Sequence, residues 1–213
     1  MDYIFDNTIK VYDNGRERIL RLLDSEYKEE AIILTVTICE VLLKDFCKTC
    51  KGVWIHHHYG AFTAGLPLKE TREYKKKIRD YLTTLRSGAY DDFLKSYYVY
   101  RDVSVNADVD ALNEILFEKN ERINFQNLND ERGARKAYQF FFDIDLKENL
   151  NSDRRVSFEK WNQLAKLIRE RHDIIHAGSG STMTTDEIRD VISSLDYLKT
   201  FLVNKIGSYY SNQ

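Results

Sequence analysis

Proline is nearly absent from this chain of 213 residues, and glycine occurs only nine times. A single proline leaves long helices uninterrupted, and so few turn-forming residues argue against a β-sandwich or barrel with many tight turns. Cysteine is scarce too, with three residues, so we expect no disulfide framework. The longest apolar run, 31–38, falls far short of the roughly 20 residues that span a bilayer.

An excess of charge of one sign is also missing. Lys and Arg number 32 against 34 Asp and Glu, which gives a formal net charge of −2. Any role with nucleic acid must therefore depend on a local basic patch. The first residues mix acids with apolar side chains and lack the apolar core of a signal peptide, so we expect a cytoplasmic protein without a membrane partner. The length predicts one domain over residues 1–213.

Apolar residues recur at three- and four-residue spacing along most of the chain and predict an all-α helical bundle with an irregular, loop-rich middle. Gly178 follows the second-last helix and should end it. Thr184 and Glu187 have capping-box spacing and should begin the last helix, whose apolar stripe runs from Ile188 to Ile206. The predicted helices cover residues 8–24, 28–49, 69–86, 89–101, 108–118, 131–142 and 157–177, and the predicted irregular segments are 51–68, 119–130 and 143–156.

Cys47 and Cys50 form a C-x-x-C pair, and His56, His57 and His58 follow closely. Thiolate and imidazole are the ligands that zinc prefers, so a zinc site is one interpretation. The favoured interpretation is that the cysteines are small apolar residues near a helix end and that the histidines lie in the following loop.

The segment 169–178 reads Arg-Glu-Arg-His-Asp-Ile-Ile-His-Ala-Gly. On a helical wheel Arg171 falls in the middle of an apolar arc, with His172 at its edge and His176 just beyond. An arginine there needs a buried carboxylate, such as Asp143 or Asp145, or a cleft shared with a partner chain. Since Arg171 and His176 are about 140° apart on an ideal helix, the helix end or a second copy would have to bring them together.

This pattern resembles the HEPN superfamily, whose helical domains carry an R-x(4–6)-H motif with a polar residue after the Arg. Arg171-x4-His176, with His172 in that polar position and Ala-Gly after it, is very similar to the RiboL-PSP-HEPN-like branch. The segment Ile123-Asn-Phe-Gln-Asn-Leu128 also resembles one that precedes the motif helix there. The specific match covers about residues 120–206. Arg169-x6-His176 satisfies the spacing as well, so the register is not unique.

The resemblance implies a metal-independent endoribonuclease of a toxin, abortive-infection or other defence system. In that reaction the RNA 2′-OH attacks the adjacent phosphate and leaves a 2′,3′-cyclic phosphate. His176 would then be the acid/base and Arg171 the phosphate clamp, because imidazole titrates near neutrality and guanidinium is a planar permanent cation. His172 would orient one of them or carry the second proton, and Arg169 is the alternative clamp.

The resemblance also implies partners. We expect a homodimer in which two motifs face each other, an RNA substrate, no metal and no cofactor, and a cognate antitoxin such as a small nucleotidyltransferase. Several cations near the motif could guide a phosphate backbone or form an ordinary solvated helix face. They are Arg154, Arg155, Lys160, Lys166, Arg169 and Arg171.

Other interpretations of the same residues stay open. His176 could cap the helix C-terminus as a favourable cation. Residues 178–181 could cradle a phosphate with backbone amides, although an ordinary turn is favoured. The basic face of the predicted helix 69–86 could contact RNA or simply be solvated. The whole chain could be a non-catalytic HEPN module that binds nucleotide, RNA or a partner protein.

Overall fold

The computed structural model describes most of the two ends of the chain and part of its middle. Every named secondary-structure element in this described part is an α-helix, so the predicted all-α bundle is confirmed. Residues 124 and 133 form an isolated bridge without a strand around it. None of the described helices is both long and apolar enough to cross a membrane. The described residues are 5–49, 76, 79–80, 82–84, 87–88, 91, 124–125, 127–128, 133–151 and 160–211.

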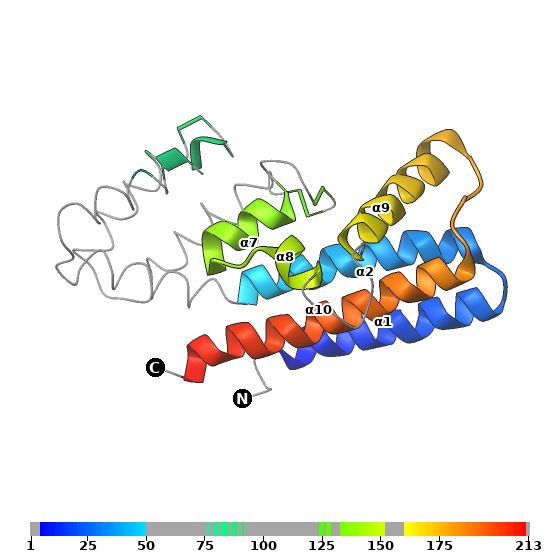
Figure 1. Cartoon of the computed structure of the whole chain (residues 1–213), viewed down its shortest axis with the longest axis horizontal. Coiled ribbons are helices and arrows are strands. Elements are labelled where there is room, and N and C mark those ends of the chain that lie inside the picture. The colour runs from blue at the N-terminus through cyan, green and yellow to red at the C-terminus, as the bar shows by residue number, and fades with distance from the viewer. Residues whose placement is uncertain are drawn as a thin grey trace.

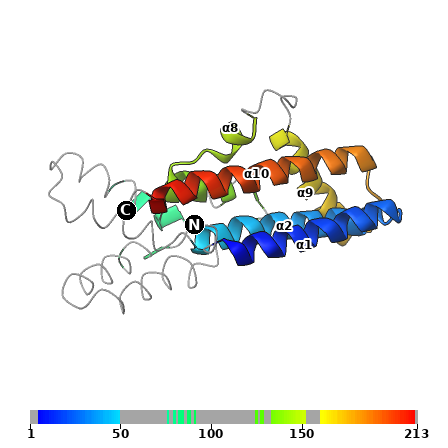
Figure 2. The ribbon, with the colours of Figure 1, turned by 90° about the horizontal axis from the view of Figure 1, so that it is seen from below.

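Three long helices form one side of the bundle: α1 (Asp6–Asp24), α2 (Lys28–Thr49) and α10 (Thr185–Ser211). They contact one another and run side by side in both views (Figure 1, Figure 2). The N-terminal end of α1 and the C-terminal end of α10 lie at the same end of this layer. The shorter helices α7 (Ala134–Phe142), α8 (Leu146–Asn151) and α9 (Lys160–Ala177) pack on the other side of α2 and α10.

The apolar stripes predicted for the long helices form the core. Every predicted stripe position of α10 is buried, because an i, i+3, i+4 pattern places these side chains on one face. These buried residues are Ile188, Val191, Ile192, Leu195, Leu198, Leu202 and Ile206. The central helix α2 contributes another buried set: Ile32, Val36, Leu42, Leu43 and Phe46.

Gly15 explains how α1 and α2 come close together. Glycine inside a helix costs roughly 0.5–1 kcal/mol relative to alanine. A Cβ atom at this position would lie only 2.6 Å from Cγ2 of Ile38 on α2. The absence of a side chain therefore permits the observed packing of the two helices.

Polar pairs fix α10 against α1. Asp196 accepts hydrogen bonds from the Tyr12 hydroxyl at 3.0 Å and from Nε of Arg16 at 2.8 Å. Lys199 donates to Asp13 at 2.6 Å. Burial raises the pKa of Tyr12, and the neighbouring Asp196 carboxylate raises it further, so the phenol stays protonated and keeps donating.

Helix boundaries follow the predictions where those helices are described. The helix predicted over 28–49 has these same bounds, and those predicted over 8–24 and 131–142 begin within a few residues of the expected positions. The helix predicted over 69–86 is described only at scattered helical positions. The helices predicted over 89–101 and 108–118 lie outside the described residues, apart from residue 91, and so does the expected cap Ser157.

One prediction about the middle of the chain is wrong. Residues 143–156 were expected to be irregular, yet α8 occupies Leu146–Asn151. Asp145 begins this helix, because its carboxylate accepts the backbone N–H groups of Lys147 and Glu148 at 2.9 and 3.2 Å. Leu146 and Leu150, one turn apart, are buried. The helix thus depends on one cap and two core side chains, too few for its apolar pattern to reveal it.

Candidate active site

Helix α9 carries the predicted motif and is buried only along its first half. Trp161, Leu164 and Leu167 are in the core, whereas Ile168 and Ile174 are half-buried. Ile175, which the helical wheel places on the apolar arc, is 46% exposed. The helix is inclined to the three-helix layer and its C-terminal end stands away from it (Figure 1). The motif residues therefore lie on the projecting half of the helix.

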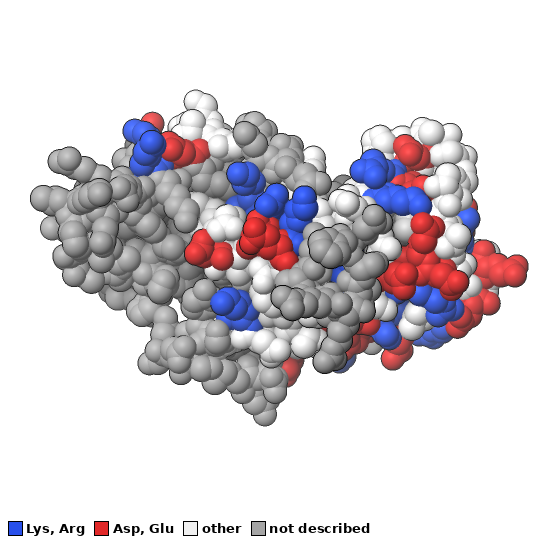
Figure 3. All heavy atoms as spheres, in the orientation of Figure 1, with Lys and Arg blue, Asp and Glu red and all other residues white. Residues whose placement is uncertain are grey.

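A pocket of about 510 Å³ opens beside this part of α9. One wall belongs to the helix and the other to the segment that precedes α7. Figure 3 shows Lys and Arg side chains on the α9 side of a hollow in this face. The lining residues are Ala165, Ile168, Arg169, Arg171, His172 and Asp173 from α9, with Asn124, Asn127 and Leu128 opposite.

Two of the three predicted catalytic residues line this pocket directly. Arg171 is half-buried, with its Nε atom fully covered, and His172 is exposed at the rim. Arg169, the alternative clamp, lines the pocket as well. His176 does not line it. In both registers, therefore, the arginine lines the pocket and the shared histidine, His176, does not.

His176 is instead joined to the pocket through His172. The two imidazole rings lie one helical turn apart, with their centroids at 4.5 Å and their planes inclined by 48°. Residues at i and i+4 share a face of an α-helix, which explains the contact. His172 therefore forms the edge of the pocket and His176 lies just outside it, on exposed surface.

The opposite wall is the segment singled out for its resemblance to the stretch before HEPN motif helices. Phe125 and Leu128 are buried and anchor it. The backbone N–H of Asn127 donates to the backbone oxygen of Asn124 at 3.0 Å, and Asn127 in turn accepts from the N–H of Ala134 at 3.1 Å. Of the predicted loop 119–130, the described residues 124–125 and 127–128 thus form a hydrogen-bonded turn joined to the start of α7. Its two asparagines face the motif helix across the pocket.

The two carboxylates considered as partners of Arg171 have other partners. Asp145 accepts from Nε of Arg135 at 2.9 Å and caps α8. The hydrogen bonds from Arg135 lower the pKa of Asp145. Asp143 accepts from the Gln139 amide at 2.6 Å. These two acids therefore serve α7 and α8, while Arg171 faces the pocket.

The other cations of the predicted basic patch are divided among different tasks. Lys160 is buried, and its Nζ atom lies 5.0 Å from the centre of the Tyr197 ring. Lys166 donates to Glu187 at 2.9 Å and links α9 to α10. Neither lines the pocket. Arg154 and Arg155 lie outside the described residues. The role of Lys166, Arg154 and Arg155 in RNA binding stays a prediction.

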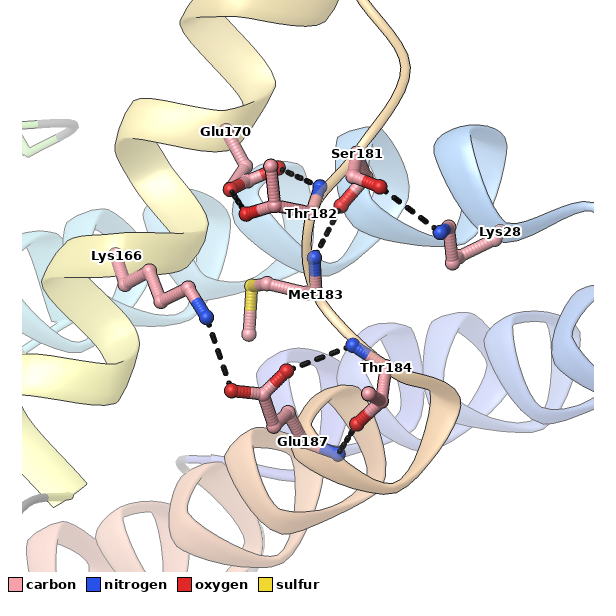
Figure 4. A network of polar contacts seen from close by, with 8 residues as sticks. All are labelled: Lys28, Lys166, Glu170, Ser181, Thr182, Met183, Thr184 and Glu187. Atoms are coloured by element: carbon pink, nitrogen blue, oxygen red, sulfur yellow. Dashed lines mark hydrogen bonds and ion pairs between the residues drawn. The ribbon is translucent and has the colours of Figure 1, made fainter.

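The end of α9 is set by Gly178, which has a φ of +62° as predicted for a helix-stopping glycine. The capping box that begins α10 is also confirmed. The backbone N–H of Thr184 donates to Glu187 at 2.7 Å, and the N–H of Glu187 donates to the Thr184 hydroxyl at 3.2 Å (Figure 4).

Three carboxylates hold the linker 178–184 between these two helices. Glu29 of α2 accepts the N–H of Ser181 at 3.1 Å, and Glu170 of α9 accepts that of Thr182 at 2.9 Å. Glu187 of α10 accepts that of Thr184 (Figure 4). The hydrogen bond from Ser181 lowers the pKa of Glu29, and that from Thr184 lowers the pKa of Glu187. Burial alone would raise the pKa of Glu170, but its hydrogen bonds from Thr182 and Ser181 outweigh burial and lower it.

This arrangement bears on the idea that residues 178–181 cradle a phosphate. The Ser181 amide is occupied by a glutamate of the chain itself. A phosphate at that point would have to displace a carboxylate. We therefore assign the linker a structural role, in which it fixes the end of α9 and with it the position of His176.

The cysteines bear only partly on the zinc interpretation. Cys39 and Cys47 are buried, and burial raises the pKa of Cys39 to about 12. In the part of the chain that the structure describes, no group of three or more His, Cys, Asp or Glu side chains could hold a metal ion. Cys50 and His56, His57 and His58 lie outside that part.

Asn127 and Asp173 are pocket residues that the sequence did not single out individually. The available signal was the unusual run of four asparagines in residues 119–130, which was interpreted only as loop. Comparison of the chain with protein-family models, curated proteins and solved structures gives no match.

Proposed function

We propose that this chain is a metal-independent endoribonuclease of the HEPN type. The observation that carries the proposal is the pocket that both Arg171 and His172 line, with the His176 ring in tilted contact with the His172 ring. A permanent cation in the pocket, one imidazole at its rim and a second imidazole just outside it are the groups that RNA transesterification needs. A biological role as a toxin, an abortive-infection factor or another defence nuclease follows from the resemblance to HEPN proteins.

The proposed chemistry assigns one task to each residue. Arg171 binds the phosphate and stabilises the negative charge that grows on it, because guanidinium is planar and permanently charged. His176 exchanges the protons of the 2′-OH nucleophile and the 5′ leaving oxygen, as an imidazole can do near neutral pH. His172 lies between them in the chain and either orients His176 or carries the second proton. Arg169 assists in phosphate binding.

A second copy of the chain completes the proposed site. In one copy His176 lies outside the pocket lining, on an exposed face that also carries Ile175. A two-fold axis near α9 would bury Ile175 and bring each His176 towards the partner's pocket, since a self-complementary surface is what two-fold pairing requires. We therefore propose a homodimer whose interface includes α9. A cognate antitoxin, such as a small nucleotidyltransferase, remains a proposal from the resemblance.

The test is cleavage of single-stranded RNA in EDTA, compared with an RNA that carries one 2′-deoxy substitution at the cut position. We expect cleavage of the first with a 2′,3′-cyclic phosphate end, and none of the second, because its nucleophile is absent. Equal cleavage of both would refute the reaction type. Activity that disappears in EDTA and returns with a divalent ion would refute metal independence. Tight RNA or nucleotide binding without cleavage would favour the non-catalytic alternative.

A further inference from the structure

The pocket beside α9 offers three kinds of chemical group in one space. Arg169 and Arg171 supply positive charge at the helix wall, and Leu128, Ala165 and Ile168 supply an apolar surface. Asn127 supplies a side-chain amide from the opposite wall. A nucleotide has a matching composition: an anionic phosphate, a flat apolar base and an edge of hydrogen-bond donors and acceptors.

We propose that this pocket binds one nucleotide of single-stranded RNA and that Asn127 selects its base. The proposal rests on the proposed function for its class of substrate, and it names the residue that decides where the chain binds. A base edge can be contacted in this way only where it is not paired, so the substrate is a single strand or a loop. The volume of about 510 Å³ is in the usual range of small-molecule sites.

Both backbone polar groups of Asn127 are hydrogen-bonded. Its N–H donates to Asn124 and its oxygen accepts from Ala134, while the next residue, Leu128, is buried in the core. The side chain at position 127 is itself exposed. An amide held on a rigid turn can discriminate between bases, because little conformational freedom is lost when it binds.

Asn124 acts as a positioning residue for this turn. Its side-chain oxygen accepts the N–H of Asn127 at 3.3 Å, beside the backbone bond between the same residues. An oxygen engaged with the backbone is less available to a ligand. The support of the turn is thus the task of Asn124, and contact with the base falls to Asn127, which is exposed and lines the pocket.

The phosphate end of the nucleotide is assigned to the arginines. In the described part of the chain Arg169 forms no ion pair with a carboxylate, although Asp173 lies one turn further along the same helix. Arg169 is exposed and lines the pocket wall. A phosphate bound by one of these arginines would place the attached base towards Asn127, on the opposite wall of the pocket.

The experiment measures binding of the four nucleoside 3′-monophosphates to the full chain by calorimetry and by NMR titration. The variants are Asn127→Ala, which removes the amide, and Asn127→Asp, which keeps its shape but replaces the donor with an acceptor. Asn162→Asp is the matched control, because Asn162 lies exposed on α9 and does not line the pocket.

We expect the wild type to prefer one nucleotide by about tenfold or more, which is the effect of one good amide–base pair. Asn127→Ala should bind all four with similar affinity, and Asn127→Asp should change their order. Asn162→Asp should keep the wild-type order. Equal wild-type affinity for the four nucleotides, no saturable binding of any of them, or an unchanged preference in folded Asn127→Ala would each overturn the proposal.

These results separate the binding proposal from the nuclease proposal. A base preference that depends on Asn127 in a chain that cuts no RNA would support this inference and refute the proposed reaction. Cleavage with the same sequence preference in wild type and in Asn127→Ala would support the nuclease proposal and refute base selection by Asn127.

Discussion

The imidazole ring of His176 contacts that of His172 at a tilt, with 4.5 Å between the ring centroids and 48° between the ring planes. This contact connects an exposed motif residue to the rim of the pocket that Arg171 lines. On a helical wheel Arg171 and His176 lie about 140° apart. His172 links them, because it lines the pocket beside Arg171 and its ring contacts that of His176. His172, the polar residue after the motif arginine, therefore lies between the pocket and His176.

The first prediction concerns the two histidines. His176→Ala should lower the cleavage rate by about 10²–10⁴, the usual contribution of a general acid or base. Both rings are exposed, so the variant should keep the wild-type circular dichroism and melting temperature. His172→Ala should lower the rate as well, because it removes the ring that supports His176. Full activity of a folded His176→Ala protein would contradict the mechanism.

The second prediction separates the two arginines. Arg171→Lys should abolish cleavage, because an ammonium group keeps the charge but loses the planar fork. Arg169→Ala should weaken RNA binding and reduce its salt dependence while leaving most of the catalytic rate. Gel cleavage at several salt concentrations measures both effects. Arg18→Ala, on the exposed face of α1, is the charge-matched control. The prediction fails if Arg171→Lys cuts at the wild-type rate.

The third prediction concerns the dimer. Light scattering should give twice the chain mass at micromolar concentration, and Ile175→Asp should give a monomer with little cleavage activity. A buried charge would oppose association at the proposed interface. Val11→Asp is a matched control, because Val11 is 42% exposed on α1, close to the 46% of Ile175. A wild-type monomer, or a dimer that Ile175→Asp does not affect, would refute this interface.

The fourth prediction concerns acid stability. Glu29, Glu170 and Glu187 have lowered pKa values in the folded chain, so their stabilising effect is present above the ordinary glutamate pKa and is lost as pH falls through the folded values. Glu187→Gln should lower the melting temperature at pH 7 by roughly 2–4 °C, as expected for a weakened helix cap.

The same substitution should have a smaller effect in acid, once the pH has fallen through the lowered folded pKa of Glu187 and the wild-type carboxylate has taken up its proton. Thermal melts by circular dichroism between pH 7 and pH 3 measure this difference. Glu30→Gln, at an exposed position of α2, should melt like the wild type throughout. A Glu187→Gln defect that keeps the same size as the pH falls would show that the carboxylate charge has no part in holding the linker.

The sequence by itself determined the helical class, most described helix boundaries and the inner faces of the long helices. These properties are local, because an apolar period of 3.6 residues, a capping box at Thr184 and Glu187 and a glycine at position 178 act within one or two turns. The short helix α8 escaped prediction because its stability depends on tertiary burial of Leu146 and Leu150 more than on its own pattern.

Only the tertiary structure decided which residues meet at the candidate site. Asn127 and Arg171 are 44 positions apart in the chain, and nothing in their local sequence indicates that they line one pocket. The tertiary structure also assigned Asp145 to Arg135 and Lys166 to Glu187. These ion pairs depend on how whole helices pack against one another. Local sequence shows which side chains share a face of a helix, but only the packing decides which side chain of a neighbouring helix lies opposite each of them.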